Sequence, residues 1–196
     1  MDDVSGSWNA VAAEYISRRS SRIGVATLRK WAADLPPGGS ILDLGCGHGI
    51  PISAALMEDG FKVYGIDASP ILVEEFRQKC PDALVRCEPV ETSNFFDRKF
   101  DAVIAIGLMF LLSEDTQRQF IHRVSGVLNP GGRFLFTAPT QKVAWADNLT
   151  GRQSRSLGRE EYEAALRKAG VELVAGYTDG GENHYYSAKR STAPAR

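Results

Sequence analysis

The chain has 196 residues, 43% hydrophobic and 24% charged, a balance typical of one globular domain and not of a disordered segment. Lys and Arg total 23 against 24 Asp and Glu, so the net charge of −1 provides no general attraction to nucleic acid or to an anionic membrane. The three cysteines, Cys46, Cys80 and Cys87, lack CxxC spacing and indicate neither a disulfide framework nor a metal site.

The apolar runs of the sequence bear on membrane insertion and export. Its longest apolar run, from Ala102 to Leu112, is shorter than a bilayer-spanning helix and contains Gly107. The opening residues, MDDVSGSWNA, are acidic and lack an apolar core. We therefore expect no secretory signal and a cytoplasmic location.

Apolar residues at helical spacing between Val25 and Leu35 predict a helix before the first strand. From residue 40 onward, short apolar runs alternate with helical patterns. The runs are nearly continuous in apolar or β-branched residues, as in strands buried on both faces of a parallel sheet. The predicted strands are Ser40–Leu44, Lys62–Asp67, Ala83–Cys87, Phe100–Ile106 and Arg133–Ala138.

Helix boundaries are marked between these strands. Ser69 and Pro70 have the residue types of an N-cap and a first helical position, for a helix through Lys79. Ser113, followed by two acidic residues, opens another helix, which the sequence NPGG at 129–132 ends. This repeated strand–helix pattern predicts an α/β fold with right-handed crossovers.

The C-terminal part has a different pattern. Glu160–Ala169 is predicted as a helix, and Val171–Thr178 and Asn183–Lys189 as two strands joined by a short turn. That turn makes a hairpin, so the sheet of seven strands is expected to be mostly parallel with an antiparallel last strand. Residues 139–158 are polar and without clear periodicity, and we expect them to form a functional or mobile loop.

The first predicted strand runs into a glycine-rich turn, in the sequence ILDLGCGHGI at 41–50. A dinucleotide fingerprint has glycine at its first, third and sixth positions, but here the sixth position is Ile50. The phosphate-cradling pattern GxxxxGK(S/T) is missing as well. Asp67 ends the second strand 22 positions after Gly45, where an acid accepts hydrogen bonds from ribose hydroxyls. The pattern favours a nucleoside ligand without a required pyrophosphate.

Four segments follow one another along the chain: ILDLGCGHG at 41–49, YGIDAS at 64–69, FDAVIAIG at 100–107 and LNPGGRFLFTAP at 128–139. In order and spacing they resemble the class I S-adenosylmethionine-dependent methyltransferases of the small bacterial type. The resemblance covers the chain from about Trp8 to the final strand. It implies a single-domain, Rossmann-like doubly wound fold over residues 1–196. It also implies an enzyme that uses S-adenosyl-L-methionine and releases S-adenosyl-L-homocysteine.

The resemblance assigns roles to individual cofactor-binding residues. Asp67 would accept hydrogen bonds from both ribose hydroxyls. An N-terminal helix over 7–20 would cover the cofactor, although core packing is the alternative for its two aromatic side chains. The sequence CEPVE at 87–91 departs from the Gly-Asp-Ala usual at the adenine amino group. The full expected set is Asp43, Gly45 and Gly47 at the methionine end, Asp67 at the ribose, Ala68, Glu88 and Val90 around the adenine, Ile106 beside the cofactor at the end of the fourth strand, and Trp8 and Tyr15 in the lid.

The acceptor is expected to be a small molecule. The residues after the fourth strand are IGLMFLL and not Asn-Pro-Pro-Tyr or Asp-Pro-Pro-Tyr, which argues against methylation of nucleic-acid bases or glutamine. Met109 and its apolar neighbours favour an apolar or aromatic acceptor, with Trp145 and Tyr185 as further walls. His184 titrates near neutral pH and is the candidate to orient or deprotonate the acceptor. The alternative role for His184 is plain packing across the terminal hairpin.

Two other functional classes stay open. One is a non-catalytic domain that binds S-adenosylmethionine, or a partner, without transferring a methyl group. The other is a nicotinamide-dependent oxidoreductase, which Ile50 and the final hairpin disfavour. We expect no bound metal, no nucleic acid or membrane partner, and a monomer or homodimer.

Overall fold

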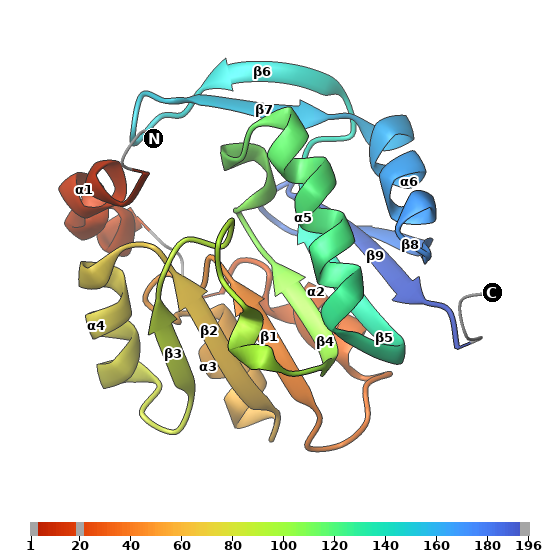
Figure 1. Cartoon of the computed structure of the whole chain (residues 1–196). Helices are drawn as coiled ribbons and strands as arrows, with labels where there is room; N and C mark the ends of the chain where they lie inside the picture. The colour runs from red at the N-terminus through yellow and green to blue at the C-terminus, as the bar shows by residue number, and fades with distance from the viewer. Residues whose placement is uncertain (1–3, 19–21, 193–196) are drawn as a thin grey trace.

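The computed structural model describes residues 4–18 and 22–192, and a seven-stranded sheet forms its centre (Figure 1). The strand order is β3-β2-β1-β4-β5-β9-β8, and β9 runs antiparallel to both of its neighbours. β1 lies in the middle of the parallel part and is buried along its whole length, as its mainly apolar sequence predicts. The strands are β1 Ser40–Leu44, β2 Lys62–Asp67, β3 Leu84–Cys87, β4 Phe100–Ala105, β5 Leu128–Thr137, β8 Val171–Thr178 and β9 His184–Arg190.

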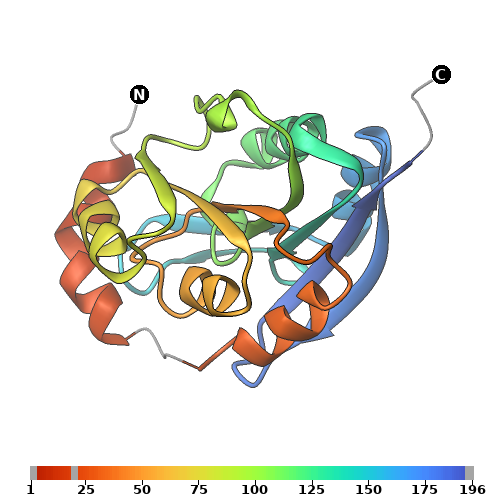
Figure 2. The ribbon, with the colours of Figure 1, turned by 90° about the horizontal axis from the view of Figure 1, so that it is seen from below.

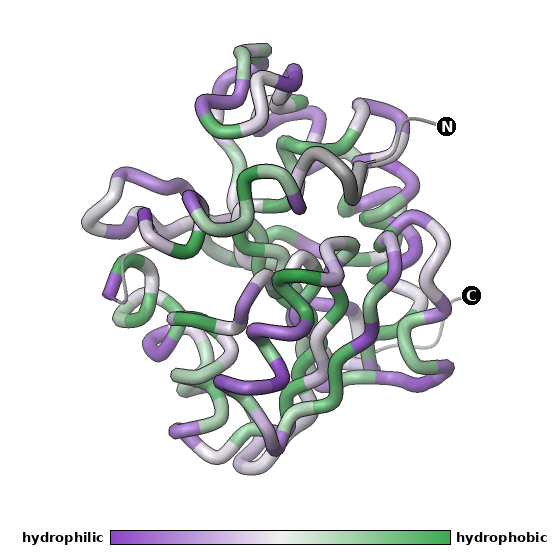
Figure 3. The backbone as a smooth tube through the Cα atoms, turned by 90° about the vertical axis from the view of Figure 1, so that its left-hand side faces the viewer, coloured by the Kyte–Doolittle hydropathy of each residue, from purple (hydrophilic) through white to green (hydrophobic). Residues whose placement is uncertain are grey.

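Helices cover both faces of the sheet, which creates two apolar cores (Figure 2). The tube coloured by hydropathy shows hydrophobic residues gathered along the central strands and hydrophilic ones on the outer turns (Figure 3). One face is covered by α2 Val25–Ala32, α3 Ile52–Glu58 and α4 Pro70–Lys79, and the other by α5 Glu114–Val127 and α6 Arg159–Lys168. This arrangement confirms the predicted doubly wound α/β fold with an antiparallel last strand.

Two helices begin where their capping residues predict. Ser69 Oγ accepts a hydrogen bond of 3.2 Å from Leu72 N at the start of α4, and Pro70 occupies the first helical position. Ser113 Oγ accepts one of 3.2 Å from Thr116 N at the start of α5. Local hydrogen bonding therefore decides both boundaries, which is why they were readable from sequence.

The N-terminal helix α1, Val4–Arg18, packs against α4. It corresponds to the helix predicted over residues 7–20, of which residues 19 and 20 lie outside the described ranges. None of the helices within those ranges is long and apolar enough to cross a membrane.

Residues 139–158 do not form the expected loop. They contain an antiparallel hairpin of β6, Lys142–Ala146, and β7, Gln153–Leu157, which stands apart from the main sheet. The inward positions of β7 include Ser154 and Ser156, both 1% exposed, while β6 is largely exposed. Because serines take the buried positions, the hydropathy alternation that identifies a strand is missing from the sequence.

Gly49 and Gly60 offer a matched test of packing near the glycine turn. Their φ angles are +84° and +87°, a conformation that costs other residues roughly 1–2 kcal/mol. A Cβ on Gly49 would also lie 2.8 Å from Cys80 Sγ, whereas a Cβ on Gly60 would meet nothing within 4 Å. We expect Gly49→Ala to lower the free energy of unfolding in urea by roughly 1–3 kcal/mol more than Gly60→Ala. Equal losses would show that this contact is not tight.

Candidate functional site

A pocket of about 480 Å³ opens at the carboxyl ends of β1, β2 and β4, a volume within the range of small-molecule sites. Ligands of open α/β sheets bind at this edge, where the strand order reverses. One part of the lining comes from the turn after β1 and the end of β2. The opposite part comes from the segment after β4, the start of α5 and the turn of the β6–β7 hairpin.

The glycine turn is fixed over the end of β2 by backbone hydrogen bonds. Gly45 N and Cys46 N both donate to Ile66 O, at 2.8 and 3.1 Å. Gly45 and Gly47, two of the predicted cofactor-binding residues, line the pocket. Gly49 has another role, because its missing side chain lets the turn lie against Cys80 and the helix α4. The third glycine of the motif is therefore a packing residue.

Asp67 joins the glycine turn to the start of α4. Its Oδ2 accepts a hydrogen bond from Gly47 N and its Oδ1 accepts one from Ser69 N, each 2.9 Å long. Burial raises the pKa of this carboxyl, although both N–H donors act in the opposite direction. Each oxygen has a further lone pair, and Asp67 lines the pocket, so the carboxylate is able to accept hydrogen bonds from two ligand hydroxyls.

Helix α1 covers one side of this pocket. Trp8 and Tyr15 line it, with their rings edge to face at 5.8 Å between centroids. The Tyr15 hydroxyl lies directly over Gly47, 3.2 Å from where a Cβ would stand. Asn9 Oδ1 accepts a hydrogen bond of 2.6 Å from Ser69 Oγ, which connects α1 to the same turn that Asp67 braces. The structure thus brings the two predicted lid aromatics to the pocket.

The segment after β3 forms the neighbouring wall. Ala68, Val90 and Ile106, which were predicted to contact the cofactor, line the pocket. Glu88 does not line it, because Glu88 Oε1 accepts a 2.5 Å hydrogen bond from Ser93 Oγ within its own loop. Glu91 lines it instead. The sequence CEPVE carries both glutamates, and only the loop conformation selects between them.

Asp43 lies behind the glycine turn. Its side chain is 3% exposed, is not part of the pocket lining, and accepts a hydrogen bond of 2.6 Å from Ser53 Oγ in α3. A buried carboxylate needs such donors to offset its lost hydration. This placement supports a bracing role between β1 and α3 and not the predicted direct contact with a ligand.

The opposite end of the pocket is mainly apolar. Leu108, Phe110 and Leu149 line it together with Ser113 and Thr116, whose hydroxyl groups lie 2.7 Å apart. These residues come from three separate parts of the chain and share no sequence motif.

Several residues predicted for the acceptor lie outside this lining. Met109 is fully buried in the core. Trp145 packs behind Phe110, with ring centroids 5.5 Å apart. The 3-10 turn Met109–Leu111 and the strand β6 direct these two side chains away from the pocket, while Phe110 and Leu111 line it.

His184 and Tyr185 also lie elsewhere, on the last strand. His184 packs edge-on against Tyr186 at 4.7 Å, and burial, together with the Arg159 charge, lowers its pKa. Tyr185 is buried and donates a 2.7 Å hydrogen bond to Asp179 Oδ2. Neither residue is part of the pocket lining. For His184 the structure therefore favours the alternative of packing within the terminal hairpin.

Part of the chain matches a known protein family. Residues 41–132 match the family model described as "Methyltransferase domain". No curated protein matches the chain at a significant level. In the part of the chain that the structure describes, no group of three or more His, Cys, Asp or Glu is placed to hold a metal.

Solved structures share the fold of the whole chain. The CcbJ methyltransferase from Streptomyces caelestis has a TM-score of 0.78 and 18% identity, over 98% of this chain and 100% of its own. The magnesium protoporphyrin IX methyltransferase from Synechocystis, with bound S-adenosylmethionine, has a TM-score of 0.74 and 18% identity, over 97% and 98%. The 1,6-didemethyltoxoflavin N1-methyltransferase from Burkholderia thailandensis, with bound 1,6-didemethyltoxoflavin and S-adenosylhomocysteine, has a TM-score of 0.71 and 18% identity, over 95% and 85%.

The bracing role of Asp43 leads to a prediction with a matched control. Ser53→Ala removes a donor to a buried carboxylate, whereas Ser125→Ala removes a 2.6 Å hydrogen bond to the neutral Ala169 carbonyl. We expect free energies of unfolding lower by roughly 1.5–3 kcal/mol for Ser53→Ala and about 0.5–1.5 kcal/mol for Ser125→Ala. Urea denaturation measures both, and a smaller loss for Ser53→Ala would contradict the role.

Proposed function

We propose that this chain is a class I S-adenosylmethionine-dependent methyltransferase, which transfers the methyl group of S-adenosylmethionine to a small-molecule acceptor by in-line displacement. The observation that carries the proposal is the joining of two motifs at one pocket. The glycine turn and the Asp67 carboxylate are hydrogen-bonded to each other, and both line the same cavity.

The residues present fit this cofactor. Gly45 and Gly47 allow close approach at the methionine end, and Asp67 would accept hydrogen bonds from the two ribose hydroxyls. Glu91 is better placed than Glu88 to receive the adenine amino group, because it lines the pocket. Ala68, Val90 and Ile106 would border the adenine, while Trp8 and Tyr15 exclude water from above.

The bound cofactor supplies a methyl group that is already activated on a sulfonium. The protein has mainly to hold the acceptor in line with it, and positioning alone can contribute roughly 7–11 kcal/mol. The acceptor end offers the carboxylate of Asp147, but its Oδ1 accepts hydrogen bonds from Leu149 N, Thr150 N and Thr150 Oγ1 of its own turn. None of the histidines His48, His122 and His184 lines the pocket, so we propose catalysis by alignment, without a histidine base.

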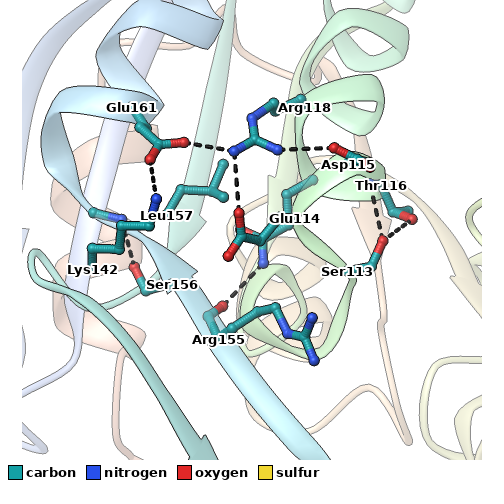
Figure 4. Close-up of polar contacts among 12 residues, drawn as sticks. Ser113, Glu114, Asp115, Thr116, Arg118, Lys142, Arg155, Ser156, Leu157 and Glu161 are labelled. Atoms are coloured by element: carbon teal, nitrogen blue, oxygen red, sulfur yellow. Dashed lines mark hydrogen bonds and ion pairs between the residues drawn. The ribbon is translucent and has the colours of Figure 1, made fainter.

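The β6–β7 hairpin is proposed as the acceptor-side wall. Lys142 and Arg118 converge on Glu161 from β6 and α5, with ion pairs of 2.5 and 2.7 Å (Figure 4). Gln117 Nε2 donates a 3.0 Å hydrogen bond to Arg155 O of β7. The hairpin is thereby attached to α5 and α6, and its turn is held over the pocket. A hairpin fixed in this way would select acceptors by their shape.

The apolar lining favours a flat or partly apolar acceptor. Phe110 and Leu149 offer apolar surface, and the Ser113 and Thr116 hydroxyls supply polar contacts. Methyltransferases of the same fold are named for small molecules such as 1,6-didemethyltoxoflavin and magnesium protoporphyrin IX, which supports an acceptor of this size class.

Calorimetry tests the cofactor assignment directly. We expect wild-type protein to bind S-adenosylhomocysteine and to show no measurable binding of NAD, because the glycine turn lacks a glycine at its sixth position. Asp67→Ala should weaken S-adenosylhomocysteine binding about ten- to a hundredfold, since a hydrogen bond to a charged group contributes roughly 1.5–3 kcal/mol. Asp82→Ala, at an exposed turn, is the control and should bind as wild type. Binding of NAD alone would overturn the proposed function.

The acceptor assignment is tested by screening flat phenols and aromatic amines with radiolabelled S-adenosylmethionine, then comparing two variants on the best substrate. Phe110→Ala should lower kcat/KM at least about tenfold while S-adenosylhomocysteine affinity stays unchanged, because Phe110 lines only the acceptor end. His184→Ala should retain wild-type kcat/KM. The reverse result would move the acceptor to the β9 side of the fold.

A further inference from the structure

The loop between β3 and β4 borders the pocket in an unfavourable backbone conformation. Phe95, Phe96 and Asp97 have φ angles of +51°, +61° and +51°, three consecutive non-glycine residues in the left-handed region. Each such residue costs roughly 1–2 kcal/mol, so the loop needs contacts that hold it. Val90 and Glu91, which line the pocket, lie in the first part of the same loop.

Arg123 of α5 holds that first part. Its Nη1 donates hydrogen bonds to Val90 O at 2.5 Å and to Glu91 O at 2.8 Å. Its Nη2 donates to Ser93 O, and the guanidinium lies 4.4 Å from the ring centroid of Phe95, which is 2% exposed. One planar group therefore binds three carbonyl groups within four residues and covers the side chain that anchors the turn.

The rest of the loop is held by separate contacts. Arg86 donates a 2.6 Å hydrogen bond to Asn94 Oδ1 and lies 4.4 Å from the Phe96 ring centroid. Asn94 Nδ2 in turn donates to Asp97 Oδ2 at 2.5 Å. These contacts fix residues 94–97, which do not line the pocket. The Arg123 bonds, in contrast, reach Val90 and Glu91, the two residues of this loop that line the pocket.

The carbonyl partners explain why an arginine is needed. Val90 O, Glu91 O and Ser93 O are neutral acceptors, and burial lowers the pKa of the Arg123 guanidinium although the charge of Glu91 acts in the opposite direction. A guanidinium stays charged under such conditions and presents donors in a rigid fork. A lysine ammonium is a single point of donation on a flexible stem and does not span three carbonyl groups as well.

We propose that Arg123 is a positioning residue for the adenine end of the pocket, acting through the carbonyl groups of Val90, Glu91 and Ser93. The proposal rests on the proposed function, because it takes the adenine of S-adenosylmethionine as the occupant of that end. Arg123 itself does not line the pocket, so its effect on binding passes through the loop.

The experiment compares Arg123→Met, Arg123→Lys and Arg167→Met, the last an exposed arginine of α6. Calorimetry well below the melting temperature measures the Kd of S-adenosylhomocysteine and of adenosine for each. Arg123→Met should raise both Kd values by the same factor, roughly tenfold, because only the adenine end is loosened. Arg123→Lys should lie between Arg123→Met and wild type, and Arg167→Met should match wild type. Hydrogen exchange of the 90–95 amides should be faster in Arg123→Met.

Each result decides a specific point. Unchanged Kd values in Arg123→Met and Arg123→Lys, with a lowered melting temperature, would show that Arg123 only stabilises the fold. If Arg123→Met does not fold, Kd values of Arg123→Lys equal to those of wild type would overturn the proposal alone. A weaker S-adenosylhomocysteine complex with unchanged adenosine binding would do the same. Wild-type protein that binds neither ligand would overturn the proposed function itself.

Discussion

The hydrogen bond from Gly47 N to Asp67 Oδ2 ties together the ends of the two central strands β1 and β2. The Asp67 carboxylate also accepts a hydrogen bond from the backbone N–H of Ser69, the residue that caps helix α4. Ser69 Oγ in turn donates a hydrogen bond to Asn9 Oδ1 in α1. One carboxylate thus sets the glycine turn, the start of a helix and the attachment of the lid. Such an arrangement is rigid because the carboxylate is partly buried and each bond to it is charge-assisted.

Helix α5 supports the pocket from the other side. Arg123 holds the loop after β3, while Gln117, which is fully buried, holds the hairpin. Gln117 Nε2 also donates to Leu112 O at 2.9 Å, and its Oε1 accepts from the Tyr162 hydroxyl at 2.6 Å. Two pocket walls that are distant in sequence are therefore positioned by one helix. Motion of α5 relative to the sheet would alter both together.

The residues of the glycine turn, together with Asp43 and Asp67, have two different physical roles. Gly45 and Gly47 border the ligand space, and Asp67 offers its free lone pairs to that space. Asp43 and Gly49 serve the scaffold, one by accepting from Ser53 and the other by admitting the side chain of Cys80. The motif is recognisable as a whole because binding and packing both constrain it. The spacing of the residues does not by itself reveal which of them bind the ligand and which of them pack the scaffold.

The sequence by itself determined the strands of the main sheet, two capped helix starts and the antiparallel end of the sheet, because hydropathy period and capping are local properties. It also determined the glycine turn and Asp67, since the ends of adjacent parallel strands must meet. Only the tertiary structure decided that Glu91 and not Glu88 lines the pocket and that His184 packs against Tyr186. It also decided that serines occupy buried positions of the strand β7. These outcomes depend on contacts such as those of Arg123, which join residues about thirty positions apart and leave no periodic trace in the chain.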